Sequence, residues 1–171
     1  YLRLLGEEAT EEALLAALAS RPRWEAVHLA CHGLLDPRPS LSALALSPGA
    51  ESDGFLTALE IFGTRVPADL VVLSACDSGR GAALAGDGLL GLVQAFLHGG
   101  ASGVVASLWL ADDEATAVLM REFYARWGAC EVGKRPGAAT ALRAAQAAVR
   151  AQPKWQDPYF WAGWVVWGRP D

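Results

Sequence analysis

The apolar run LVVLSA at residues 70–75 constrains the fold of this chain more than any other segment. It carries no charge, which is the pattern of a strand buried on both faces of a parallel sheet. Further apolar, β-type runs lie at residues 25–30 and 103–108, and a last, aromatic one lies at residues 159–167. Helical patterns separate these runs. The order of elements therefore predicts an α/β fold, a three-layer sandwich with a mostly parallel sheet.

Capping residues and terminal glycines or prolines mark the expected helices. These signals place helices at residues 7–20, 88–98, 112–127 and 138–151. Thr57 and Glu60 have the spacing of a capping box, which predicts the start of a short helix. We also expect a strand at residues 1–5, a loop at residues 34–40, and a small hairpin between residues 41–46 and 54–56.

The length and charge of the chain exclude several classes of protein. The 171 residues are enough for one domain, residues 1–171, with a substantial core. The net charge is −5 and there is no basic stripe, so we expect no nucleic-acid partner. No apolar run approaches the roughly 20 residues that span a bilayer, so we expect no membrane partner.

The cysteines are few and odd in number: Cys31, Cys76 and Cys130. This set does not make a disulfide framework, and it suits a reducing compartment, so we expect a cytoplasmic protein. No C-x-x-C spacing occurs, and Cys31 and His32 are adjacent, so they would point to opposite faces of a strand. We therefore expect no metal site.

Two of the expected strands end in a reactive side chain followed by glycine. VHLACHG at residues 27–33 ends in His32 and Gly33, and VVLSACDSG at residues 71–79 contains Cys76, 44 positions after His32. The carboxyl ends of parallel strands meet at one edge, so neighbouring strands would place the thiol beside the imidazole. An imidazole can take the thiol proton, and the N–H groups of Gly33 and Cys76 could form an oxyanion hole. The pattern indicates nucleophilic acyl transfer without an organic cofactor.

The segments HLACHG and LSACDSG resemble the His and Cys boxes of the CHAT domain, a bacterial branch of the caspase and separase superfamily. Further similar segments are DGFLT at 53–57, GDGLLG at 86–91, SLW at 107–109, DDEAT at 112–116 and PYFW at 158–161. The resemblance implies a caspase-like fold and a cysteine endopeptidase, with His32 as the base and Cys76 as the nucleophile. It also implies a protein or peptide substrate and an upstream tetratricopeptide repeat domain.

The chain begins at Tyr1 rather than Met, so we expect a C-terminal fragment of a longer protein. The resemblance implies a further strand and helix ahead of Tyr1, with that strand lying between residues 1–5 and residues 25–30. Without it, we expect either a gap filled by another copy, giving a homo-oligomer, or a rearranged edge.

Three carboxylates are candidates for binding a basic P1 residue of a substrate: Asp112, Asp113 and Asp87. Helix capping is the competing interpretation for the first two, because they follow a strand and precede a helix. Arg38 and Arg80 would instead suit an acidic P1 residue. The balance favours arginine or lysine at P1 but leaves the preference open.

Two competing functional interpretations remain, and each belongs to a different class of protein. The first is a non-catalytic, caspase-like interaction module of a repeat-containing scaffold. The second is nucleotide binding, because GDGLLG at residues 86–91 matches G-x-G-x-x-G. About ten residues separate it from the preceding strand, and Asp87 would repel a pyrophosphate, which argues against nucleotide binding.

Other residues with reactive or aromatic side chains are expected to be structural. His28 and Cys31 are assigned to packing, and Cys130 to a connector. The aromatic residues of 155–167 are expected to pack in the core and along the sheet edge, with a substrate-pocket wall as the alternative.

Overall fold

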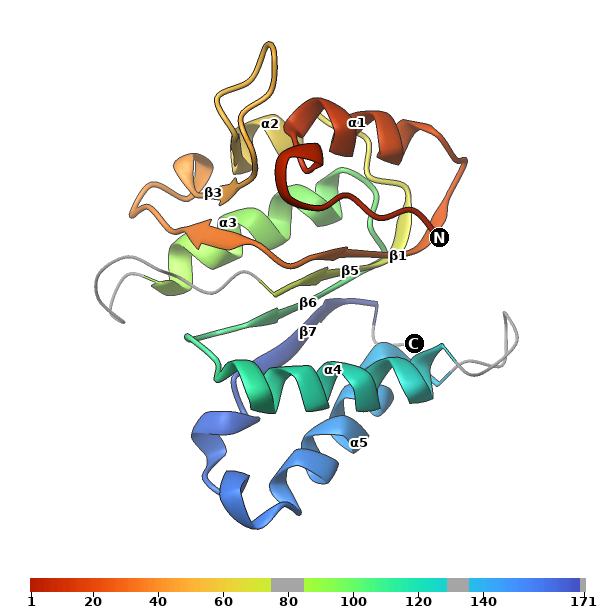
Figure 1. The fold of residues 1–171 in the computed structure, drawn as a ribbon, viewed down its shortest axis with the longest axis vertical. Helices are drawn as coiled ribbons and strands as arrows, with labels where there is room; N and C mark the ends of the chain where they lie inside the picture. Colours follow the sequence, from red (N-terminus) through yellow and green to blue (C-terminus); the bar gives the residue numbers. More distant parts are fainter. Residues whose placement is uncertain (75–84, 129–135, 170–171) are drawn as a thin grey trace.

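The computed structural model describes residues 1–74, 85–128 and 136–169. Its centre is a four-stranded sheet in the order β1-β5-β6-β7 (Figure 1). The strands are β1 (Trp24–Leu29), β5 (Ala68–Leu73), β6 (Gly103–Ser107) and β7 (Trp164–Gly168). β1, β5 and β6 are parallel, and β7 runs antiparallel to β6. The predicted mostly parallel sheet is confirmed.

Helices cover both faces of this sheet and complete the three layers (Figure 1). One face carries α1 (Glu11–Ala19), α2 (Ala58–Phe62) and α3 (Ala85–His98), and the other carries α4 (Asp113–Trp127) and α5 (Ala138–Arg150). Short 3-10 helices lie at Gly6–Glu8, Pro39–Leu41, Pro153–Trp155 and Pro158–Phe160. None of the helices in the described residues is long and apolar enough to cross a membrane.

The helix starts follow from the capping residues in the sequence. Thr10 Oγ1 accepts the Ala13 N–H at 3.2 Å, and Asp112 Oδ1 accepts the Ala115 N–H at 2.8 Å. Thr57 and Glu60 form the full capping box, with each side chain bonded to the other's backbone N–H. These bonds satisfy N–H groups that a helix leaves unpaired in its first turn.

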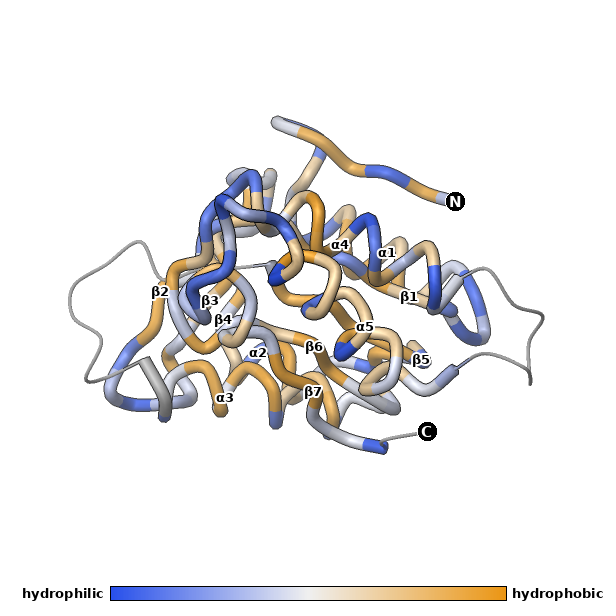
Figure 2. The backbone as a smooth tube through the Cα atoms, turned by 90° about the horizontal axis from the view of Figure 1, so that it is seen from below, coloured by the Kyte–Doolittle hydropathy of each residue, from blue (hydrophilic) through white to orange (hydrophobic). Residues whose placement is uncertain are grey.

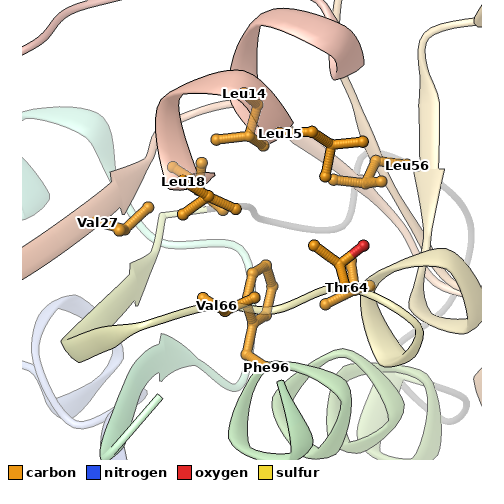
Figure 3. Close-up of a pocket in the computed structure, with 10 residues that line it drawn as sticks. Leu14, Leu15, Leu18, Val27, Leu56, Thr64, Val66 and Phe96 are labelled. Carbon is orange, nitrogen blue, oxygen red and sulfur yellow. The ribbon is translucent and has the colours of Figure 1, made fainter. Parts of the chain in front are cut away.

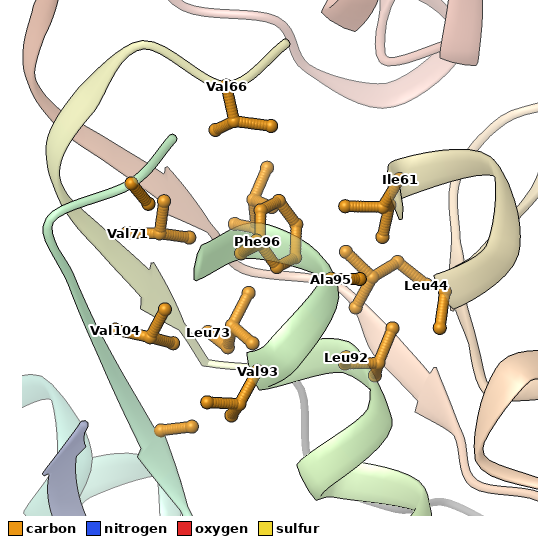
Figure 4. Close-up of a cluster of buried hydrophobic side chains, with 14 of the residues drawn as sticks. Leu44, Ile61, Val66, Val71, Leu73, Leu92, Val93, Ala95, Phe96 and Val104 are labelled. Carbon is orange, nitrogen blue, oxygen red and sulfur yellow. The ribbon is translucent and has the colours of Figure 1, made fainter. Parts of the chain in front are cut away.

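The sheet separates two apolar cores. The core under α1–α3 includes Leu44, Leu73, Leu92 and Phe96, which are almost completely buried (Figure 4). The core under α4 and α5 includes Phe123 and a second group of apolar side chains. Along the backbone, apolar residues are frequent in the central strands and hydrophilic residues are frequent in the outer loops (Figure 2). Burial of each large side chain contributes about 1.5–3 kcal/mol, so both cores stabilise the sheet.

The first core is closely packed where α1 meets the sheet. A cavity of only about 10 Å³ remains there, lined by apolar side chains that include Leu14, Leu18, Val27 and Phe96 (Figure 3). Little empty space therefore remains between this face of α1 and the sheet.

A second, three-stranded antiparallel sheet lies beyond the carboxyl end of β1. It consists of β2 (His32–Leu34), β3 (Ala43–Ala45) and β4 (Phe55–Thr57), in the order β2-β3-β4. The predicted hairpin of β3 and β4 is confirmed. Strand β2 was not predicted from the sequence. It has only three residues, one of them glycine, and two prolines follow it closely, so its strand signal is weak.

The predicted strand at residues 1–5 is wrong. These residues form no regular element, and Leu2 and Leu5 are exposed. A cavity of about 840 Å³ lies between this segment, α1 and β1. The segment pairs with no strand in the part of the chain that the structure describes. β1 is consequently an edge strand of the sheet. That a further strand or a second copy fills this space stays a prediction.

The last strand is shorter than the aromatic run suggested. Pro158 begins a 3-10 helix, and Asp157 Oδ1 accepts the Tyr159 N–H at 2.8 Å, which turns the chain before the strand begins at Trp164. Trp155 and Trp164 are buried in the second core, as expected for packing residues.

Candidate active site

His32 lies at the carboxyl edge of the main sheet but not at the end of its strand. β1 ends at Leu29, and His32 is the first residue of β2, paired with Ala45 of β3. The expectation that the strand runs directly into His32 is therefore wrong. The chain changes sheets within residues 30–31, and the second sheet rather than the first fixes the backbone of His32. The His32 side chain is exposed.

The expected nucleophile, Cys76, lies outside the described residues, as do the DSG segment at 77–79, Arg80 and Cys130. The described residues nevertheless define where the chain leaves β5. β1 and β5 are parallel neighbours with Leu29 opposite Leu73, and Ser74 donates its N–H to the Leu29 carbonyl at 2.9 Å. The chain segments that lead to His32 and to residue 76 thus leave the sheet next to each other.

Gly33 follows His32 within β2 and pairs with Leu44. It is buried, whereas His32 and Leu34 on either side of it are exposed. This alternation places the Gly33 backbone against the first core and turns the imidazole away from it.

His28 and Cys31 are not part of this arrangement. His28 Nδ1 lies 2.9 Å from the Tyr124 hydroxyl of α4, and desolvation lowers the pKa of His28 although part of its surface remains exposed. Burial raises the pKa of the half-buried Cys31 thiol to about 11, so it forms little thiolate near neutral pH. Cys31 therefore has the surroundings of a packing residue, whereas His28 is exposed and held by Tyr124.

The three candidate carboxylates lie at the helix starts near the same edge of the sheet. Asp112 caps α4 and is half-buried, while Asp113 in the first turn of α4 is exposed. Asp87 is exposed in the first turn of α3, which covers the opposite face of the sheet (Figure 1). The fold therefore places Asp87 in a different layer from the other two.

Arg38, a candidate for binding an acidic P1 residue of a substrate, already forms an ion pair with Asp36. Its Nε donates to Asp36 Oδ1 at 3.0 Å, and the same oxygen accepts the Arg38 backbone N–H at 2.8 Å. The Arg38 guanidinium holds the pKa of Asp36 below its usual range. This pairing reduces the charge that Arg38 offers to a substrate.

The GDGLLG segment lies inside α3 rather than in a loop at a strand end. A Cβ on Gly88 would lie 2.7 Å from Ser42 Oγ, and one on Gly91 would lie 2.4 Å from the Pro39 carbonyl oxygen. These glycines allow α3 to approach the 36–42 segment closely. Helix packing, not phosphate binding, explains this motif.

Two polar groups near the second sheet were missed in the sequence. Ser42 is fully buried, and its Oγ accepts the Asp36 N–H at 3.0 Å. Glu11 is 7% exposed and accepts the Gly54 N–H at 2.9 Å. Glu11 follows an N-cap, where an acidic residue is ordinary, so no sequence signal indicated its burial. Among the described residues, no group of three or more His, Cys, Asp or Glu is arranged to bind a metal ion.

Comparisons with known proteins agree with this architecture. The CHAT domain model matches residues 3–169, so the chain belongs to the CHAT domain family, within the caspase-like superfamily. The chain is also similar to Tetratricopeptide repeat protein 28 of Homo sapiens and of Mus musculus, with 27% identity over 203 residues in each case. That alignment covers 96% of this chain but 8% of each relative, so the chain spans only a small part of their length.

Proposed function

We propose that this domain is a cysteine endopeptidase in which His32 and Cys76 form a catalytic dyad. The observation that carries the proposal is the pairing of β1 with β5, where Ser74 bonds to Leu29 just before the chain leads to the two reactive residues. Membership of the CHAT family supports the same assignment. A thiol and an imidazole on adjacent chain segments are the minimum required for nucleophilic acyl transfer.

In the proposed reaction, His32 takes the proton from the Cys76 thiol. The thiolate sulfur attacks the scissile carbonyl carbon, and the N–H groups of Gly33 and Cys76 bind the resulting oxyanion. His32 then gives its proton to the leaving amine as the C–N bond breaks. Water, activated by His32, releases the acyl group and restores the thiol. The reaction needs no metal or organic cofactor.

We propose that the substrate is a protein with a basic residue at P1. The exposed carboxylates Asp113 and Asp87, together with the capping carboxylate of Asp112, give the sheet edge a negative character. The ion pair of Arg38 with Asp36 weakens the case for an acidic P1 residue. A peptide library with all residues at P1, cleaved by the full-length protein, tests this preference.

Cleavage of the library tests the peptidase itself. The wild-type protein should cut peptides after Arg or Lys, and both His32→Ala and Cys76→Ala should abolish cutting. Asp113→Asn should lower kcat/KM for the basic peptides by about tenfold or more, since hydrogen bonds to charged groups contribute about 1.5–3 kcal/mol. Cleavage that survives Cys76→Ala would exclude this nucleophile.

The alternative function is an interaction module in a scaffold of tetratricopeptide repeats. The similarity to Tetratricopeptide repeat protein 28 favours an association with such repeats, and we propose an upstream repeat domain for either function. We also propose a cytoplasmic location and self-association. In the alternative, Cys76 reacts no faster than an ordinary thiol, so thiol reactivity separates the two functions.

A further inference from the structure

Side chains in the first turn of α1 accept hydrogen bonds from the loop that joins β3 to β4. Glu11 Oε1 accepts the Gly54 N–H at 2.9 Å in a buried position. Glu12 Oε1 accepts the Glu51 N–H at 3.0 Å, and Glu12 Oε2 accepts the Ser52 hydroxyl at the same distance. Two adjacent carboxylates thus accept hydrogen bonds from Glu51, Ser52 and Gly54 of one loop.

Burial of Glu11 is costly, because a carboxylate loses its hydration inside the protein. Desolvation raises the pKa of Glu11 more than the Gly54 bond lowers it, and Glu60, Asp53 and Glu12 add repulsion. Capping of α1 does not require such burial, because Thr10 already supplies the cap. The position of Glu11 is therefore explained by what its carboxylate binds.

Gly54 connects the Glu11 carboxylate to the residues that pair with His32 across the small sheet. Its φ of +86° suits glycine, and its carbonyl accepts the Leu46 N–H at 2.7 Å, which closes the hairpin. The next residue, Phe55, pairs with Ala45, and Ala45 pairs with His32. His32, Ala45 and Phe55 thus lie side by side across the three strands. The hydrogen bond from Gly54 to Glu11 lies one residue along the chain from Phe55.

The two ends of the small sheet have different supports. The end at Leu34 and Ala43 lies near Ser42, where α3 packs closely through Gly88. The end at His32 and Ala45 lies at the β3–β4 loop, which is hydrogen-bonded to α1. Ser47 strengthens this second support, since its N–H bonds to the Ala9 carbonyl at 2.9 Å and its hydroxyl donates to the Gly6 carbonyl at 2.7 Å.

We infer that Glu11 is a positioning residue, which holds the β2-β3-β4 sheet so that the His32 imidazole stays in place. The inference rests on the proposed role of His32 as the base. Glu12 and Ser47 support the same loop. Removal of the Glu11 carboxylate frees the Gly54 N–H and lets the His32 end of the sheet move, while the α3 end stays in place.

The test compares Glu11→Ala with Glu11→Gln, whose amide oxygen can still accept the Gly54 N–H. The first readout is the NMR signal of the His32 ring, assigned with His32→Ala among the three histidines of the chain. The second is the rate of Cys76 alkylation by iodoacetamide as a function of pH. Leu142→Ala in the other core is the control for a general loss of stability.

Glu11→Ala should shift and broaden the His32 signal and slow Cys76 alkylation by about tenfold, because small displacements of a reacting group are costly. Glu11→Gln should return the alkylation rate to within about threefold of the wild type. Leu142→Ala should leave both readouts unchanged. An unshifted His32 signal in folded Glu11→Ala would overturn the inference.

A second variant covers the case in which Glu11→Ala does not fold. Ser47→Ala removes only the hydroxyl bond to Gly6 and should shift the His32 signal in the same direction by a smaller amount. No shift in this variant would then overturn the inference. Failure of the proposed function is distinguished by the wild type: Cys76 alkylation that is independent of His32 refutes the dyad, while the His32 signal still reports on positioning.

Discussion

The carboxyl end of β1 and the outer edge of β1 differ sharply in how they are supported, although they belong to one strand of six residues. Beyond the carboxyl end, hydrogen bonds from α1 and close packing of α3 fix a second sheet that begins with His32. Along the outer edge lies a cavity of about 840 Å³ and an N-terminal segment without regular structure. The difference shows that neighbouring elements hold the chain beyond the carboxyl end of β1 in place even where the outer edge of β1 is open.

The largest expected effect is the loss of a buried side chain in the supported region. Leu44→Ala removes a fully buried leucine of β3, next to Gly33, and should lower the free energy of unfolding by about 2–5 kcal/mol. Denaturant titration measures it. A loss below about 1 kcal/mol would mean that this region is not tightly packed.

A smaller effect is expected at the start of α2. Thr57→Ala breaks the capping box directly after β4 and should lower the free energy of unfolding by about 1 kcal/mol. Thr57→Ser, which retains the hydroxyl, is the control and should keep most of the stability. Equal losses in the two variants would show that the methyl group, not the hydrogen bonds, matters here.

Acidification should weaken the hydrogen bonds between Glu12 of α1 and the β3–β4 loop. The pKa of Glu12 is lowered to about 2, because its own backbone N–H and that of Glu51 donate to the carboxylate. A carboxyl whose pKa is lower in the folded state stabilises the fold above its ordinary pKa, and this contribution is lost as the pH falls toward 2. The melting temperature should therefore fall between pH 4.5 and pH 2 less steeply in Glu12→Gln than in the wild type. Parallel curves would show that Glu12 carries no such linkage.

The smallest effect is expected at the open edge. Leu2 is 48% exposed in the N-terminal segment, so Leu2→Ala should change the free energy of unfolding by less than about 0.5 kcal/mol. The same titration as for Leu44→Ala measures it. A loss comparable to that of Leu44→Ala would mean that the N-terminal segment is packed, and the contrast between the two sides of β1 would disappear.

The elements that the sequence predicts well are those whose signals are local. The uncharged run around Val71 and Val72, the cap at Thr10 and the capping box at Thr57 each depend on neighbouring residues, and each is confirmed. The alternation of strands and helices predicted the layered fold, and the mostly parallel sheet with helices on both faces confirms it.

The features that sequence analysis missed depend on distant partners. Residues 1–5 have the composition of a strand but pair with no strand among the described residues. His32 and Gly33 form a strand only because Ala45 and Leu44 lie opposite them. Burial of Glu11 depends on a loop 43 positions away in the sequence. No local pattern encodes these contacts, whereas the adjacency of β1 and β5 followed from the general rules of parallel sheets.

The rate of Cys76 alkylation by iodoacetamide at neutral pH is the most direct test of the proposed dyad of His32 and Cys76. Cys31 and Cys130 of the same chain are the internal references. Mass spectrometry of peptides from the wild type and from His32→Ala gives the three rates. We expect Cys76 to react at least about tenfold faster than the other two, because the imidazole of the proposed dyad increases its thiolate fraction. His32→Ala should remove this advantage. Equal, slow alkylation of all three cysteines in the wild type would contradict the proposed dyad.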